Sequence, residues 1–526
     1  MTDTCRRTEV KGKNEKNNGF MSGVLILSLS AVIVKIIGLL YKIPMLRLLG
    51  SEGMGYFNSA YELYALFCTV ATTGLPVAMS VLISSGNDGE KVFRHAIRLF
   101  LLLGGVSCGV MIGFSRPFAD FLGSENAIPC IVAIAPTALI ICIISAYRGF
   151  FQGKSMMKPT ALSQMIEALG KLALGVFFAF LAIRKGSDVR IAAASAALGL
   201  TFGEALALLY LVISKRRGDK SRSTLHQAFE KGVVVSLLRI AIPVTLSSAV
   251  ISLTKVIDMA MILRRLQDMG YGASEAFGAY GNYTTLALPL FSLAPALVSA
   301  IAMPLIPALS SAISRRDEEA QRKAVSDAVR LNNLIAMPIS AGLVLFARPI
   351  LELLFKGESA AIEMSFPLLS CLGLSVTMSC LITVENAILQ AYGSPGVPII
   401  SMAVGSVIKL IVAYLLIGNA EFGIMGAPIS TFLCDLVINA INVYFISRRM
   451  NTMPGISEII IRPFAASLVA VIAARICFNM IESRAGSSSV VTLCAVAVAA
   501  IIYLPMTRVL GALKKEDFDA LTIKSK

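Results

Sequence analysis

Four lysines lie inside long apolar stretches of this 526-residue chain, where a charged side chain needs an explanation. They are Lys35, Lys171, Lys255 and Lys409. In a segment that crosses a membrane, a charge near the middle costs about 2.5–3.5 kcal/mol or more. Ammonium groups that converge on a water-filled cavity would bind an anionic group such as a pyrophosphate. The lysines therefore predict a cationic binding cavity, unless acids on neighbouring helices neutralise them.

Acidic residues occur in the same apolar stretches and keep that second interpretation open. Glu167 precedes Lys171 by four residues and Asp258 follows Lys255 by three, so each pair shares one helical face. The other two lysines have no acid at that spacing. The acids either pair with lysines across helices and hold them together, or couple transport to sodium ions or protons. The remaining acids deep in apolar stretches are Glu62, Glu204, Glu385 and Asp435.

The composition excludes a soluble enzyme. Hydrophobic residues make up 56% of the chain and charged residues 15%, with a mean hydropathy of +0.77, whereas soluble domains have about 25% charged residues. His226 falls in a predicted connection between apolar stretches and His95 at the edge of one, and the ten cysteines show no Cys-x-x-Cys spacing. We therefore predict no catalytic residues, no metal ligands and no organic cofactor.

The apolar stretches predict an all-α polytopic membrane protein. About 20 apolar residues cross a bilayer as a helix, and continuous apolar runs exclude the alternating pattern of a membrane β-barrel. This window predicts 14 transmembrane helices. They cover residues 20–48, 56–84, 93–115, 126–148, 159–183, 189–214, 233–263, 277–310, 327–351, 361–391, 397–417, 424–447, 458–481 and 488–511.

The positions of the basic residues predict the orientation. An even number of spans puts both termini on one side, and the connections on that side hold most of the lysines and arginines outside the spans. Basic connections face the cytoplasm, so both termini are predicted to be cytoplasmic. The basic residues behind the formal net charge of +15 thus orient the helices in a membrane and contact its lipids. Nucleic acid is excluded as a partner, because the densest basic cluster, between Lys215 and Arg222, has no aromatic residues interleaved with it.

An internal repeat divides the chain into two parallel halves of six helices. Ser30-Ala31-Val32-Ile33 recurs as Ser248-Ala249-Val250-Ile251, and each is followed by a lysine, Lys35 or Lys255. Lys171-Leu172 recurs as Lys409-Leu410, and Glu204 and Asp435 hold matching places. We expect a cytoplasmic tail over 1–19, an N-lobe over 20–225, a C-lobe over 226–452, a terminal pair of helices over 453–511 and a second tail over 512–526. Parallel repeats of this kind build transporters whose site lies between the repeats.

Prolines predict where helices bend for alternating access. Four prolines fall in the eighth predicted span, and Pro289 and Pro295 are its first two. Proline removes a helical hydrogen bond and kinks the helix.

One motif resembles a known family. Arg148-Gly149, Gln152-Gly153 and Pro159-Thr160-Ala161-Leu162-Ser163-Gln164 with Glu167 look like the signature of the stage V sporulation protein B group. This group belongs to the multidrug/oligosaccharidyl-lipid/polysaccharide exporter superfamily and is similar to MurJ-type lipid II flippases. The resemblance spans residues 20–510 and implies two lobes and 14 helices, with the last two helices forming a groove for a lipid tail.

The resemblance also implies roles for individual residues. Lys35 before Gly38 matches the essential basic residue of the first helix in MurJ-type proteins, and Arg148 joins the predicted cationic cavity. Where those proteins carry a second arginine, this chain has Tyr41 followed by Lys42. Gly281 and Asn282 replace an Asp-Arg pair of the eighth helix.

These observations favour a flippase for a lipid-linked oligosaccharide, with lipid II as the first substrate to test. The alternative is a cation-coupled multidrug exporter of the same superfamily, and a membrane-bound assembly scaffold is a third hypothesis. We expect a monomer, either alone or with cell-wall synthesis proteins. The sequence leaves open whether the membrane potential, sodium ions or protons drive transport.

Overall fold

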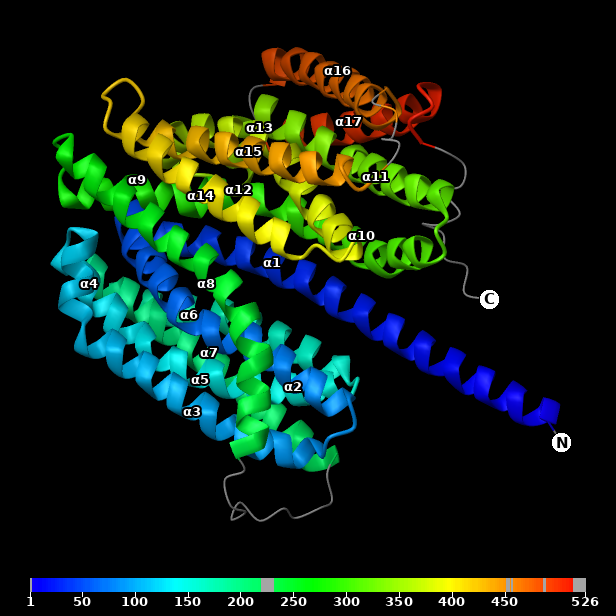
Figure 1. The fold of residues 1–526 in the computed structure, drawn as a ribbon. Helices are drawn as coiled ribbons and strands as arrows, with labels where there is room; N and C mark the ends of the chain where they lie inside the picture. The colour runs from blue at the N-terminus through cyan, green and yellow to red at the C-terminus, as the bar shows by residue number, and fades with distance from the viewer. Residues whose placement is uncertain (1, 219–230, 451–454, 456, 486–488, 514–526) are drawn as a thin grey trace. The chain divides into compact units, whose positions relative to one another are not determined.

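The computed structural model describes residues 2–218, 231–450, 455, 457–485 and 489–513, and every regular element in these ranges is a helix (Figure 1). The predicted all-helical membrane fold is confirmed. The chain forms two compact units, unit 1 over residues 1–281 and unit 2 over residues 282–526. The lobes and tails predicted from the repeat are a different division, and they stay a prediction.

Unit 1 contains the helices from α1 to α9. Its elements are α1 (Thr2–Thr69), η1 (Val70–Gly74), α2 (Leu75–Ser84), α3 (Gly89–Gly113), α4 (Ser115–Leu122), η2 (Glu125–Ala127), α5 (Ile128–Gly153), α6 (Met157–Arg184), α7 (Val189–Gly218), α8 (Lys231–Asp268) and α9 (Ala273–Asn282), whose last residue opens unit 2. Although the repeat places α8 in the second half, α8 packs against α1, α2 and η1 of unit 1.

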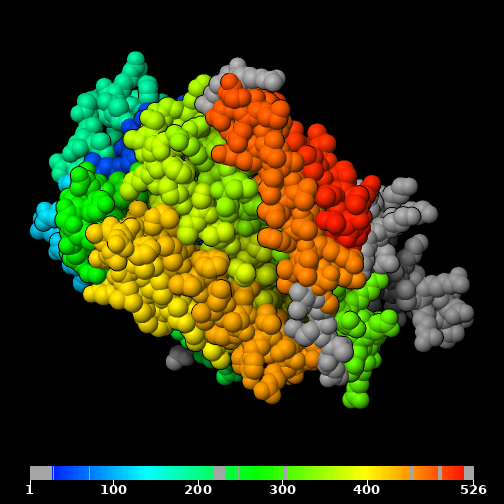
Figure 2. All heavy atoms as spheres, turned by 90° about the horizontal axis from the view of Figure 1, so that it is seen from above, coloured from blue at the N-terminus to red at the C-terminus, as the bar shows by residue number. Residues whose placement is uncertain are grey.

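Unit 2 begins with a π-helix and ends with an antiparallel pair. Its elements are η3 (Tyr283–Ala287), α10 (Leu288–Ser314), α11 (Glu318–Leu345), α12 (Ala347–Leu354), α13 (Ser359–Ala391), α14 (Gly396–Ile417), η4 (Gly423–Met425), α15 (Gly426–Ser447), η5 (Ser457–Ile461), α16 (Arg462–Ala485) and α17 (Ser489–Val509). The helices α16 and α17 lie side by side on the face seen in Figure 2. Phe346 and Phe478 pack edge to face where α16 meets the start of α12.

Twelve helices of the described chain are long and apolar enough to cross a membrane, so the predicted number of 14 is not confirmed. The difference has two causes. The first predicted span and part of the second lie in one element, α1, in which two helices meet at a kink at Gly50. The eighth predicted span is divided among α9, η3 and α10. Gly50 has φ +65° and ψ −178°, a backbone conformation that is essentially restricted to glycine.

Two of the three π-helices in the described residues, η1 and η3, stand directly before a Leu-Pro pair, and the third, η5, stands before Arg462-Pro463. Val70–Gly74 precedes Leu75-Pro76, and Tyr283–Ala287 precedes Leu288-Pro289. Because proline has no N–H, the carbonyl four residues earlier loses its α-helical donor, and a wider π turn relieves this mismatch. Pro289 therefore lies in the first turn of α10, and Pro295 lies inside that helix. Whether either residue acts as a hinge stays a prediction.

Glycines let α6 and α7 approach each other closely. A β-carbon at Gly199 would lie 2.4 Å from the Cα atom of Gly175, and one at Gly170 would lie 2.6 Å from the Cα atom of Gly203. These distances are too short for any side chain. Small residues at such contacts give membrane helices their van der Waals packing.

We predict that Gly199→Ala destabilises the protein, because the new methyl group would overlap the backbone of Gly175 and Leu174. Overpacking of this kind typically costs about 1–3 kcal/mol, so the melting temperature of the purified protein in detergent should fall. Gly105→Ala is the matched control, since a β-carbon at Gly105 meets nothing within 4 Å. Equal melting temperatures for the two variants would contradict this packing.

Candidate functional site

Lys171 lies among three aromatic rings in unit 1. Its Nζ atom is 4.5 Å from the ring centroid of Tyr61, 5.1 Å from that of Tyr41 and 5.6 Å from that of Phe57. All three distances are within the range of cation–π attraction, which is worth about 0.5–2 kcal/mol per contact. We call these three rings the aromatic cage of Lys171.

The bend of α1 makes the aromatic cage. Tyr41 precedes Gly50, whereas Phe57 and Tyr61 follow it. Tyr41 and Phe57 are almost completely buried, and their ring centroids are 6.0 Å apart. The cage was not predicted from the sequence. Helical spacing indicates that Phe57 and Tyr61 share one face of a helix, but it does not show that Tyr41, on the other side of the bend at Gly50, lies beside them.

Arg148 and Glu167 form an ion pair between α5 and α6. The Arg148 Nη2 atom donates to Glu167 Oε2 at 2.8 Å, and Nε donates to Ser163 Oγ at 2.9 Å. Only 13% of the Arg148 side chain is exposed. The spacing of four residues suggested Lys171 as the partner of Glu167. Lys171 is within electrostatic reach of Glu167, but the hydrogen-bonded partner is Arg148.

Glu204 lies on α7 beside the same cluster. It is buried, and its Oε1 atom accepts a 2.8 Å hydrogen bond from the hydroxyl of Tyr64 on α1. Lys171 and Arg148 are both within electrostatic reach of its carboxyl group. Glu62 and Lys42 complete the cluster, since Lys42 interacts electrostatically with both Glu62 and Lys171.

Lys35 and Lys255 come together in unit 1. They hold matching places in the repeat, on α1 and α8, and both side chains are exposed. The two ammonium groups are close enough for their positive charges to repel each other. The two helices are also joined by a 2.6 Å hydrogen bond between the hydroxyls of Thr69 and Ser252. Asp258, one turn beyond Lys255, is buried.

Unit 2 contains a smaller cluster around Asp435 on α15. Asp435 accepts a hydrogen bond from the Ser379 hydroxyl on α13 and is within electrostatic reach of Lys409 on α14. Glu385 accepts a 3.2 Å hydrogen bond from Asn442. Lys409, which lacks an acid at helical spacing, thus has one on a neighbouring helix. Unit 2 repeats the arrangement of Lys171 and Glu204 in unit 1.

The structure therefore groups the predicted residues into three sets. Lys171, Arg148, Glu62, Glu167 and Glu204 lie together, Lys35 lies near Lys255, and Lys409 lies near Asp435. The residues that sequence reasoning did not assign are the ring and hydroxyl partners Tyr41, Phe57, Tyr61, Tyr64 and Ser379. Among the described residues, no three His, Cys, Asp or Glu side chains are grouped so that they could hold a metal ion.

The fold and these buried charges define a multi-pass helical membrane protein whose spans carry partnered charged residues. Residues 20–312, more than half of the chain, match the family model described as "Polysaccharide biosynthesis protein". The chain belongs to this family. A second model, MatE, matches residues 243–415.

Relatives from Bacillus subtilis resemble the chain over most of its length. The uncharacterized membrane protein YabM is 25% identical, with 97% of this chain and 96% of the relative covered. Stage V sporulation protein B is 24% identical, covering 96% of this chain and 98% of that protein. Lipid II flippase MurJ is 25% identical, covering 74% and 76%. The resemblance to the sporulation protein B group and its superfamily is thus confirmed.

Solved structures show the same fold. Lipid II flippase MurJ in an inward closed conformation matches with a TM-score of 0.73 at 14% identity, covering 92% of this chain and 98% of that one. An inward-facing multidrug resistance transporter of the MATE family matches with a TM-score of 0.63 at 17% identity, covering 80% and 98%.

We predict that the aromatic cage stabilises Lys171 through cation–π attraction to the ring faces rather than through the packing volume of the rings. Tyr61→Phe keeps a ring at 4.5 Å from the ammonium group and should leave the melting temperature nearly unchanged. Tyr61→Leu removes the ring and should cost about 1–2 kcal/mol.

The control for this prediction is a double-mutant cycle with Lys171→Met. Without the ammonium group, the difference in melting temperature between Tyr61→Phe and Tyr61→Leu should shrink. An unchanged difference would assign the effect to packing alone.

Proposed function

We propose that this chain is a flippase that moves a polyprenyl-pyrophosphate-linked cell-wall precursor across the bacterial cytoplasmic membrane. The substrate is lipid II or a related lipid-linked oligosaccharide. The observation that carries the proposal is the pairing of Lys35 and Lys255. Two like charges on exposed side chains of membrane-spanning helices repel each other, and a pyrophosphate between them would relieve that repulsion.

Family membership and relatives support this choice of substrate class. The chain belongs to a polysaccharide biosynthesis family, and one relative is named a lipid II flippase. Another, from Haloferax volcanii, is named a probable low-salt glycan biosynthesis flippase. These names have in common the movement of a lipid or glycan precursor. No step in this transport requires a catalytic residue.

In this proposal the pyrophosphate binds at Lys35 and Lys255, and the cluster around Lys171 holds its helices in place. The segments of η1 with Pro76 and η3 with Pro289 are where the helices bend during alternating access. The helices α16 and α17 accept the polyprenyl tail, because many apolar side chains on them are exposed; examples are Ile476, Met480, Ile501 and Leu504. The protein acts as a monomer, driven by the membrane potential or by a sodium or proton gradient.

The second candidate is a cation-coupled multidrug exporter. It is favoured by the MatE match over residues 243–415 and by buried acids, of which Glu204 and Asp435 are the best placed. The two candidates differ in what they move and in which residues matter. A flippase depends on the lysines, whereas an exporter depends on the acids.

Complementation separates the candidates. The chain is expressed in a bacterium depleted of its own lipid II flippase, and lipid II on the outer leaflet is measured. The proposal expects exposure of lipid II and restored growth. Normal protein levels without rescue, together with drug-dependent cation antiport in vesicles, would establish the exporter instead.

We predict that Lys35→Ala and Lys255→Ala each abolish rescue without lowering the amount of protein in the membrane. Both side chains are exposed, so their loss should not disturb the packing of unit 1. Lys35→Arg keeps the charge and should retain most of the rescue. A fully active Lys35→Ala variant would refute the role in anion binding.

The orientation gives a separate prediction. A green fluorescent protein fused to the C-terminus should fluoresce, and alkaline phosphatase fused there should be inactive, because the basic connections place this end in the cytoplasm. Alkaline phosphatase fused after Lys185, in the predicted external connection between α6 and α7, should be active. The reverse pattern would overturn the topology.

A further inference from the structure

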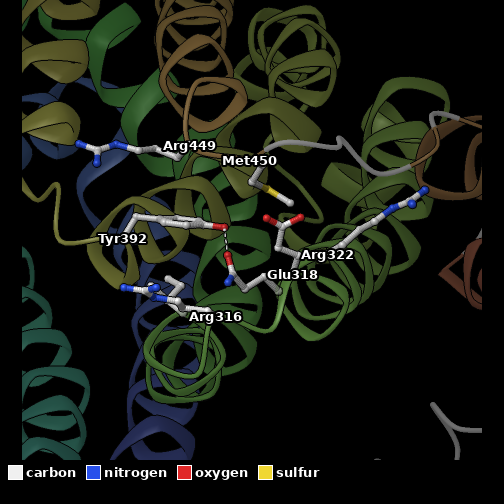
Figure 3. A pocket seen from close by; sticks show the side chains of 8 residues that line it. Arg316, Glu318, Arg322, Tyr392, Arg449 and Met450 are labelled. Atoms are coloured by element: carbon white, nitrogen blue, oxygen red, sulfur yellow. Dashed lines mark hydrogen bonds between the residues drawn. The ribbon is translucent and has the colours of Figure 1, made fainter.

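A pocket in unit 2 lies where three connections meet. It has a volume of about 230 Å3 and opens among the ends of α10, α11, α13 and α15 (Figure 3). Its lining residues are Ile313, Arg316, Glu318, Gln321, Arg322, Tyr392, Arg449 and Met450. All three connections belong to the side on which the basic residues accumulate. Pockets that bind drug-sized ligands have volumes of about 300–1,000 Å3. This pocket is smaller, so it fits a small polar group rather than a whole lipid-linked sugar.

The pocket is basic at its rim and polar inside. Arg316, Arg322 and Arg449 are exposed, and Glu318 is the one acid in the lining. Figure 3 shows the guanidinium groups of Arg316 and Arg449 extending to one side of the pocket and that of Arg322 to the other. Glu318 stands four residues before Arg322 on α11, a spacing that offsets part of its charge.

Tyr392 contributes a hydroxyl to the interior. Its OH group donates to Gln321 Oε1 at 3.0 Å (Figure 3). Burial raises the pKa of Tyr392 above its usual value, which favours the neutral phenol as a hydrogen-bond donor. The turn that carries Tyr392 is tied to the rim, because Arg449 Nη2 donates to Ser394 Oγ at 3.0 Å.

The backbone of Arg316 is an independent sign that its side chain matters. Arg316 has φ +56°, and among the described residues only Ser155 shares a positive φ without being glycine. It occupies the turn after α10, where its N–H donates to Ile313 and that of Asp317 donates to Ala312. Glycine is usual at this left-handed position. A long charged residue in a strained conformation suggests a function for its guanidinium group.

We infer that this arginine pocket, defined by Arg316, Arg322, Arg449 and Tyr392, binds the phosphate of an anionic phospholipid headgroup. Arginine forks pair with phosphate oxygens, and basic pockets at the cytoplasmic ends of membrane helices take anionic headgroups. A lipid is favoured over a soluble phosphate because α14 begins two residues after Ser394 and exposes Ile399 and Ile400. These side chains would contact the acyl chains. The site is distinct from the lysine pair of unit 1 and does not depend on the flippase activity.

Competitive binding tests the ligand. Purified full-length protein in detergent is titrated with fluorescent phosphatidylglycerol, which is then displaced by unlabelled phosphatidylglycerol, phosphatidylcholine or glycerol 3-phosphate. Phosphatidylglycerol should displace the probe at about tenfold lower concentration than phosphatidylcholine. Equal displacement by phosphatidylcholine would overturn recognition of the charge. Equal displacement by glycerol 3-phosphate would overturn the lipid in favour of a soluble phosphate.

Two matched pairs of variants assign the binding to this pocket. Arg449→Gln should lower the affinity for phosphatidylglycerol about tenfold, whereas Arg448→Gln, the same charge change one residue away and outside the lining, should not. Arg316→Gly should lower the affinity similarly without lowering the melting temperature, since glycine relieves the strain. Ser155→Gly relieves similar strain in unit 1 and should leave the affinity unchanged. Unchanged affinity in Arg449→Gln and Arg316→Gly, or equal losses in the controls, would overturn the inference.

Discussion

The cost of placing a charge among apolar helices shapes the surroundings of the buried ionised groups described above. Removing a partner from such a group costs several kcal/mol, so partners must be brought to it from other helices. For Lys171, the partners are three aromatic rings from α1 and a carboxyl group from α7. The rings reach it because α1 bends at Gly50, and α7 reaches it because four glycines let the helices touch. Features that are far apart in the sequence thus serve one ammonium group.

The sequence was sufficient for properties that depend on local patterns. Apolar runs predict helical spans, and the repeat pairs Lys171 with Lys409 and Glu204 with Asp435. In both units the structure places that lysine within electrostatic reach of that acid. The number of spans differs from the prediction, because a hydropathy window detects neither the kink at Gly50 that joins two helices in α1 nor the division of the eighth span among three elements.

Partners across helices could not be predicted in the same way. The spacing of Glu167 and Lys171 favours a pair on one helix, but Arg148, 19 residues away on α5, donates the hydrogen bond. The arginine pocket has the same origin. Its residues come from three connections and the adjoining ends of α10 and α11, and the basic residues among them look in the sequence like ordinary orientation signals. Only their position around one pocket, together with the positive φ of Arg316, indicates a second role for the same charges.

The four lysines that first suggested an anion site are not equivalent in the structure. Lys171 is held by rings and Lys409 has Asp435 nearby, so an incoming phosphate would compete with partners that are already present. Lys35 and Lys255 lie close enough for their like charges to repel each other, and both side chains are exposed. They meet because α8 packs on α1 within unit 1, although the repeat assigns the two helices to different halves. An anion bound between Lys35 and Lys255 would relieve their repulsion. In the proposed flippase, the phosphate site would therefore lie on the first and seventh predicted spans, and the buried clusters would keep those helices in position.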